Sequence, residues 1–217
     1  MNISDQRFSD DTLKLGDLYE ATWSDKPLRI IGFDDAEVFY DARWSDNTWT
    51  FSGNFKKKGY FYRASTKTFS NHAKKIGTLI LSAEELEGFR PDLPLRVLQI
   101  RNLNWNDFPV NDEDKFVDHI HERLGGYPQN QIIKSNKIVL VPSGKKGGLK
   151  KGVVISADNS SYFTPTELIC KAKEIQESQT DEKSNGIGIY RLGFEKRIPS
   201  YSIGEYTGEY ISNLGID

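Results

Sequence analysis

The chain has 217 residues, of which 37% are hydrophobic and 28% are charged. This balance excludes both general disorder and a membrane-embedded chain, and the length is enough for one large domain or two small ones. The net charge of −2 excludes a general attraction to nucleic acid, so any such binding must come from local charge.

The first 17 residues are polar and acidic, whereas a secretory signal begins with basic residues and an apolar run. No stretch has the roughly 20 apolar residues that a membrane-spanning helix needs, so we expect no membrane partner. The single cysteine, Cys170, cannot form a disulfide within the chain, which fits a reducing compartment. We therefore expect a cytoplasmic protein.

Residues 18 to 63 alternate short aromatic and β-branched runs with polar turns, one of them at Asp34 and Asp35. This spacing predicts a small antiparallel barrel or a strongly bent sheet, similar in architecture to SH3 and Tudor barrels. The aromatic residues have two interpretations. They fill the core, or some of them stay exposed as a stacking platform or cation cage: Tyr40, Trp44 and Trp49.

Ser82 and Glu85 form a capping-box pattern that predicts a short helix, and residues 95 to 100 follow as a predicted strand. We expect a soft domain boundary between residues 66 and 82. It divides a β-barrel-like unit at residues 1–70 from an α+β unit at 82–217, with one continuous domain as the alternative. The predicted fold class is α+β.

The second part contains two predicted main helices. Residues 111 to 126 place apolar side chains on one helical face, and Thr164, Pro165 and Glu167 mark the start of the other helix, whose buried face includes Leu168, Ile169, Ala172 and Ile175. Residues 137 to 157 form a predicted hairpin, and residues 186 to 194 a strand. The remaining C-terminal residues are expected to form an irregular tail with several glycines.

Lysines gather at the tips of two predicted hairpins. The loop SGKKGGLKKG lacks the Lys-Ser/Thr ending of a phosphate-binding P-loop and is followed by a strand, so it is no nucleotide cradle. Residues 123 to 157 carry seven bases and no acid, which is typical of a surface that contacts a polyanion. Lysines at such tips also hinder edge-to-edge aggregation. The candidate binding residues are Lys56, Lys57, Lys58, Lys145, Lys146, Lys150 and Lys151.

The sequence contains only weak patterns for metal-binding or catalytic residues. His119 and His121 lie about 200° apart on a helix, so they cannot share one ion, and we expect no metal site in the cluster from Asp118 to Glu122. Glu167 and Glu174 flank Cys170 on its helix and disfavour the thiolate that a nucleophile needs. Asp158 and Glu195 follow two strands and could hold a catalytic magnesium, with Lys196 nearby.

The sequence therefore favours a non-catalytic binding or adaptor protein that contacts nucleic acid or an acidic protein through its lysine-rich hairpin tips. No catalytic residue and no cofactor is predicted. The first alternative is a magnesium-dependent nuclease or related hydrolase using Asp158 and Glu195. The second is a protein-interaction module that uses its acidic regions to bind a basic partner.

Overall fold

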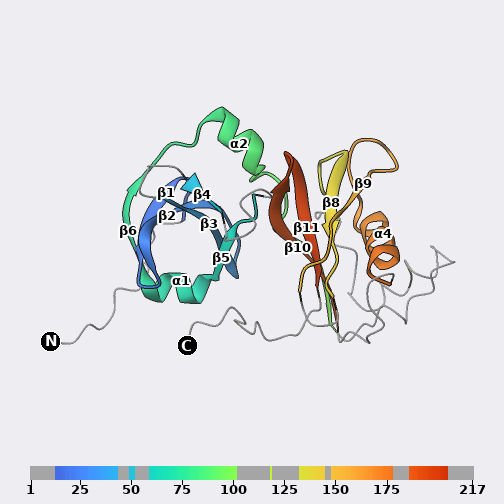
Figure 1. The fold of residues 1–217 in the computed structure, drawn as a ribbon, viewed down its shortest axis with the longest axis horizontal. Coiled ribbons are helices and arrows are strands. Elements are labelled where there is room, and N and C mark those ends of the chain that lie inside the picture. The colour runs from blue at the N-terminus through green and yellow to red at the C-terminus, as the bar shows by residue number, and fades with distance from the viewer. Residues whose placement is uncertain are drawn as a thin grey trace. The chain divides into compact units, whose positions relative to one another are not determined.

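The computed structural model describes residues 13–43, 49–51, 59–101, 118, 132–144, 148–177 and 186–204. The chain has a mixed α+β fold, as predicted, and divides into two compact units at residues 1–91 and 92–217 (Figure 1). Within the described residues, no helix is long and apolar enough to cross a membrane.

The first unit is built on an antiparallel sheet in the order β4-β3-β2-β1-β6, with β5 also paired to β3. Its strands are β1 (Asp17–Ala21), β2 (Ser24–Phe33), β3 (Glu37–Arg43), β4 (Trp49–Thr50), β5 (Tyr62–Ser65) and β6 (Ala73–Thr78). Among the described strands, no ladder joins β6 to β4 or β5. The strand-rich antiparallel unit is thus confirmed, while closure into an SH3- or Tudor-type barrel stays a prediction.

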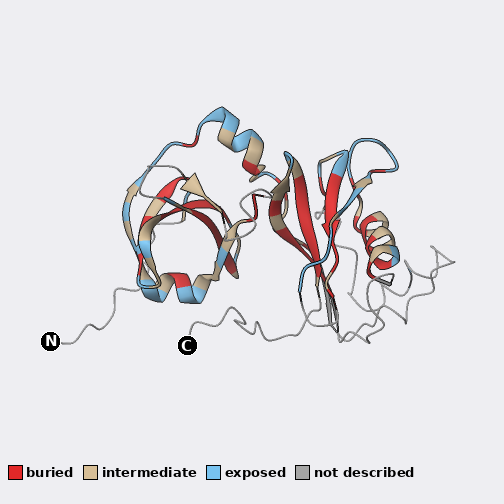
Figure 2. Ribbon diagram, viewed as in Figure 1, coloured by how far each residue is buried: buried red, intermediate tan, exposed pale blue. Residues whose placement is uncertain are grey.

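The core of this unit is formed mainly by β2 and β3, each of which has five successive buried residues. Leu28 and Ile30 from β2 pack with Val38 and Tyr40 from β3 and with Phe69. Figure 2 shows buried residues along the strands of this sheet. The turn between β2 and β3 forms at the predicted place. The Asp34 carboxylate closes it by accepting hydrogen bonds from the backbone N–H groups of Ala36 and Glu37, at 2.9 and 2.8 Å.

Two short helices complete the first unit: α1 (Thr66–His72) and α2 (Ala83–Phe89). Ser82 and Glu85 form the predicted capping box at the start of α2. The segment 66–82, where we expected a junction, contains α1 and β6, and β6 pairs with β1 along its length. The compact unit continues to residue 91 because this segment completes its sheet.

The second unit contains a sheet in the order β7-β10-β11-β8-β9. Its strands are β7 (Arg96–Arg101), β8 (Lys137–Val141), β9 (Val153–Ser156), β10 (Gly186–Glu195) and β11 (Ile198–Gly204). The pair of β8 with β11 is parallel and the other pairs are antiparallel. β11 corrects the prediction of an irregular tail for this segment, because Pro199 and the neighbouring glycines obscure its alternation.

Helix α4 (Pro165–Glu177) covers one face of this sheet. Leu168, Ile169 and Ala172 are buried as predicted and share a core with Ile138 and Leu140 of β8. The helix starts where the sequence predicts, since Glu167 N–H donates to the Thr164 hydroxyl at 3.2 Å. The predicted helix at residues 111–126 lies outside the described residues except for Asp118.

Candidate functional site

The β8–β9 hairpin predicted from the sequence is confirmed, and its pairing continues beyond the two strands. Lys150 N–H donates to the Pro142 carbonyl at 2.9 Å, and Gly144 N–H donates to the Gly148 carbonyl at 2.8 Å. Hydrogen bonds therefore hold the backbone at Lys150, so the Lys150 side chain starts from a fixed position on the hairpin.

A side chain of α4 fixes this hairpin to the body of the unit. The Gln176 amide donates to the Ser143 carbonyl at 2.9 Å and accepts from Ser143 N–H at 3.1 Å. The Ser143 hydroxyl donates to the carbonyl of Ile203 in β11 at 2.6 Å. Because Gln176 is buried and satisfies both backbone groups of one residue, the hairpin has a fixed origin on the sheet and helix.

Lys150 and Lys151 are both exposed. A Cβ on Gly144 would overlap the Lys150 side chain, so the stem of this lysine crosses the hairpin above that glycine. Within the described part of the chain, neither ammonium group pairs with a carboxylate. The other predicted lysines lie outside the described residues: Lys56, Lys57, Lys58, Lys145 and Lys146.

The structure adds two cations that were not among the predicted binding residues. Lys196 and Arg197 form the two-residue turn between β10 and β11, closed by the pair Glu195–Ile198, and both are exposed. Their φ angles are 52° and 65°, in the left-handed region that such turns usually fill with Asn and Gly. This turn could have been predicted from two basic residues between two strands. That prediction requires β11 to be recognised as a strand.

The β10–β11 turn precedes β11, which runs parallel to β8 with Ser200 opposite Val139, so the turn lies near the start of β8 and the hairpin loop follows its end. The Glu195 side chain reaches toward the hairpin, since a Cβ on Gly152 would be 3.5 Å from Glu195 Oε2. Glu195 Oε2 is buried and has no hydrogen-bond partner among the described residues. We call the set Lys150, Lys151, Lys196 and Arg197 the basic end. Its positive charge exceeds the single negative charge that Glu195 supplies.

The structure describes two of the three residues of the proposed aromatic platform, and one of these, Tyr40, is buried. Tyr40 is 7% exposed, stacks on Tyr62 with ring centroids 5.6 Å apart, and accepts a hydrogen bond from the Trp23 indole. Burial raises the pKa of its hydroxyl. Trp49 is half-buried and its ring lies 4.4 Å from the Arg29 guanidinium, while Trp44 lies outside the described residues. A buried ring such as Tyr40 cannot stack on a base from solvent.

The two carboxylates of the nuclease alternative belong to strands that are not neighbours, since Asp158 follows β9 and Glu195 ends β10, with β8 and β11 between them. Asp158 follows the strand and is exposed, and Lys171 Nζ is 2.6 Å from its Oδ1. Burial lowers the pKa of Lys171, but its bonds to Asp158 and Glu167 outweigh this and raise the pKa above the ordinary lysine value. Glu195 lies beside Gly152, before the strand begins. The structure therefore does not place these two acids around a common ion.

The surroundings of the other candidate metal-binding and nucleophilic residues do not support these roles. No group of three His, Cys, Asp or Glu side chains within the described ranges is arranged to hold a metal ion. Asp118 is exposed, whereas His119, His121 and Glu122 lie outside those ranges. Cys170 is half-buried and packs against the core of the second unit.

Comparisons of this chain with protein families, with curated proteins and with solved structures found no match. The site must therefore be interpreted from its own chemistry.

Proposed function

We propose that this protein is a non-catalytic binding or adaptor protein whose basic end contacts a polyanion. The observation that carries the proposal is that two loops of the second unit expose four cations, Lys150 and Lys151 before β9 and Lys196 and Arg197 in the β10–β11 turn, and that the Glu195 side chain reaches from one loop to the other. Positive charge on exposed loops attracts phosphates or carboxylates and speeds their association. The lysines at 56–58, 145 and 146 belong to the proposal on sequence grounds.

The strain of the turn supports the same proposal. Two residues with side chains in the left-handed region cost on the order of 1–3 kcal/mol each, and Asn-Gly would relieve that cost. Lys196 and Arg197, in place of Asn and Gly, are expected in such a turn when their charges serve binding.

The form of the first sheet is a further part of the proposal. β4 and β5 both pair with β3, β4 at Ala42 and Arg43 and β5 from Glu37 to Tyr40. Two strands that share one edge of β3 favour a strongly bent sheet of SH3 or Tudor type. The proposed setting is the cytoplasm, where Cys170 stays reduced.

The test is fluorescence anisotropy at low salt with labelled single-stranded DNA, RNA and polyglutamate. If the four cations of the basic end engage a single strand, the log-log salt slope should be about −3. The double variant Lys150→Glu, Lys151→Glu should lose binding. Lys67→Glu, at an exposed lysine on α1 of the first unit, is the matched control and should bind normally.

Failure of all three probes to bind the wild type would refute the proposal. Binding that survives the double variant would move the contact away from the basic end.

A further inference from the structure

Strand β9 forms one edge of the second sheet and, among the described strands, pairs only with β8. Ala157 N–H donates to the Asn136 carbonyl at 3.0 Å, which shows that residue 157 points its backbone groups toward the β8 side. Because these groups alternate along an antiparallel strand, those of Val154 and Ser156 point away from β8. β9 therefore presents an edge that a further strand could use.

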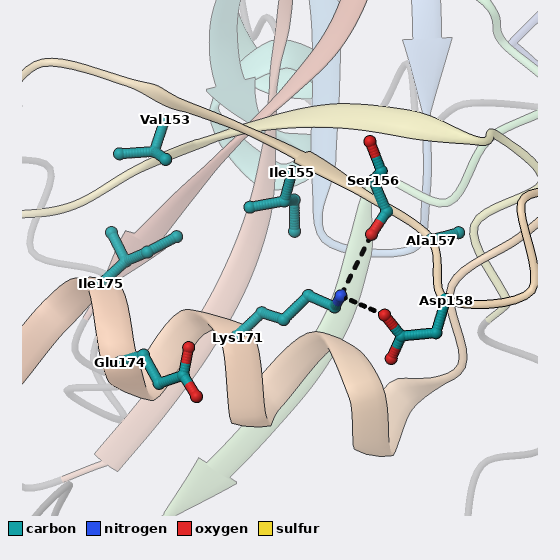
Figure 3. Close-up of a pocket in the computed structure, with 8 residues that line it drawn as sticks. All are labelled: Val153, Ile155, Ser156, Ala157, Asp158, Lys171, Glu174 and Ile175. Atoms are coloured by element: carbon teal, nitrogen blue, oxygen red, sulfur yellow. Dashed lines mark hydrogen bonds and ion pairs between the residues drawn. The ribbon is translucent and has the colours of Figure 1, made fainter.

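A groove of about 630 Å³ runs between this strand and α4 (Figure 3). Val153 and Ile155 of β9 and Ile175 of α4 supply its apolar surface, and Glu174 and Lys171 line the helix side. Side chains on one face of an added strand would enter this groove, while its backbone paired with β9.

The surface of this edge is unusually apolar for a position next to water. Val153 is 43% exposed and Val154 is 55% exposed. Exposed β-branched residues on an unpaired edge are the arrangement that proteins ordinarily block with charge, proline or a covering segment. On β9 such a block is visible at one end.

Lys171 provides that block. Its Nζ reaches from α4 to the Ser156 carbonyl at 3.1 Å and to Asp158 at 2.6 Å (Figure 3). The outward carbonyl of Ser156 is thus occupied, while no other described residue pairs with the outward backbone groups of Val154. An added strand would begin beside Lys171 and run toward Gly152.

The charges at the two ends of the groove differ. Lys150 and Lys151 are exposed just before β9, whereas Asp158 follows it. An antiparallel partner would enter beside Asp158 and leave beside the two lysines. Its acidic residues should therefore follow its apolar residues.

We propose that the groove between β9 and α4 binds an extended acidic protein segment, which adds to β9 as an antiparallel strand with its acidic end at Lys150 and Lys151. This rests on the proposed function and names the polyanion as a polypeptide. A second copy of the chain fits less well, since a four-residue strand spans only about 13 Å, short of the contact that a stable dimer requires.

The probe is a fluorescein-labelled peptide with valine and threonine in alternation, followed by a run of glutamates. We expect full-length wild type to bind it with a Kd on the order of 10–100 µM in anisotropy titrations. The reversed peptide, with glutamates first and the same composition, should bind at least about fivefold more weakly, because its charges would lie beside Asp158.

Val154→Pro tests the strand addition directly. It removes an N–H that points away from β8, so the hairpin keeps its own hydrogen bonds, and proline is tolerated on an edge strand in this orientation. We expect about a fivefold loss of peptide affinity. Val154→Thr keeps the N–H and the β-branched shape and is the matched control, with affinity within about twofold of wild type.

The outcomes separate this inference from the proposed function. Equal peptide affinity of Val154→Pro and wild type would overturn strand addition, even if Lys150→Glu with Lys151→Glu still abolished binding. Binding of DNA or RNA but not of the peptide would also overturn it and leave the function intact. A wild type that sediments as a dimer, and a Val154→Pro variant that sediments as a monomer, would assign the edge to a second copy and overturn it too.

Discussion

Arg29 shows how one buried charge organises the first unit. It is 1% exposed, donates to both carboxylate oxygens of Asp41 at 3.1 and 2.7 Å, and donates to Glu85 at 2.6 Å. Rings of Trp49 and Phe89 lie over the guanidinium. Burial lowers the pKa of Arg29, but its bonds to Asp41 and Glu85 outweigh this and raise it above the ordinary value. The cation therefore remains charged within the unit.

The cost of breaking this pair can be measured. Asp41→Asn keeps the shape of the side chain but leaves Arg29 with Glu85 as its one charged partner among the described residues. Burial raises the pKa of Asp41, and Arg29 opposes that effect. We expect a loss of about 3 kcal/mol in the free energy of unfolding, measured with urea. Asp35→Asn, in an exposed turn, should change stability by less than about 0.5 kcal/mol. Equal effects of the two changes would contradict this account.

Asp17 links stability to pH. It is fully buried and joins β1 to β6 through Lys75 Nζ at 2.9 Å and the Thr78 hydroxyl at 2.8 Å. Burial raises its pKa, but these bonds and the one from Lys14 N–H together lower the pKa below the ordinary 3.8. Its contribution to stability is therefore complete above the unfolded pKa. That contribution is lost as pH falls through the folded value, because the unfolded chain binds the proton first.

The pH profile of Asp17→Asn should reflect this. Between about pH 5 and pH 2.5 the free energy of unfolding should fall less steeply with decreasing pH than in wild type. Asp25→Asn removes an exposed carboxylate of the neighbouring strand and should leave the slope unchanged. Parallel profiles of wild type and Asp17→Asn would show that Asp17 does not carry the effect.

The β10–β11 turn is the element where stability and binding should conflict. Replacing Lys196 with Asn and Arg197 with Gly supplies the residues that this turn favours. We expect a gain of about 1–2 kcal/mol in the free energy of unfolding, together with weaker polyanion binding because two cations are lost. Thermal or urea unfolding and anisotropy measure the two effects.

A single-residue variant separates strain from charge in this turn. Lys196→Ala removes the charge but keeps a side chain in the left-handed region, so it should weaken binding without the gain in stability. A stabilised Asn-Gly variant that binds polyanions as wild type does would remove this turn from the basic end.

At the scale of the whole molecule, the two units have separate hydrophobic cores. Fragments 1–91 and 92–217 should therefore each fold alone, with cooperative urea transitions followed by circular dichroism. Fragment 1–70 should not, because it lacks β6, the partner of β1, and Glu85, a partner of Arg29. Cooperative folding of fragment 1–70 would favour the boundary expected from the sequence.

The sequence alone determined those features that depend on neighbouring residues. The Asp34 turn between two strands, the Ser82–Glu85 capping box and the start of α4 at Thr164 were all predictable, because turns and caps are formed by side chains within a few residues of the backbone groups they bind. The hairpin and the exposure of Lys150 and Lys151 were predictable for the same reason.

Tertiary structure decided what depends on residues far apart in the chain. Glu85 was predictable as a cap, but its contact with Arg29 requires the folded unit, as does the burial of Tyr40. The folded second unit brings the Glu195 side chain to Gly152, and among the described strands the sheet order leaves β9 at an edge. No local pattern encodes these contacts, because strand order follows from how whole apolar faces are buried together, and that burial joins residues regardless of their separation in sequence.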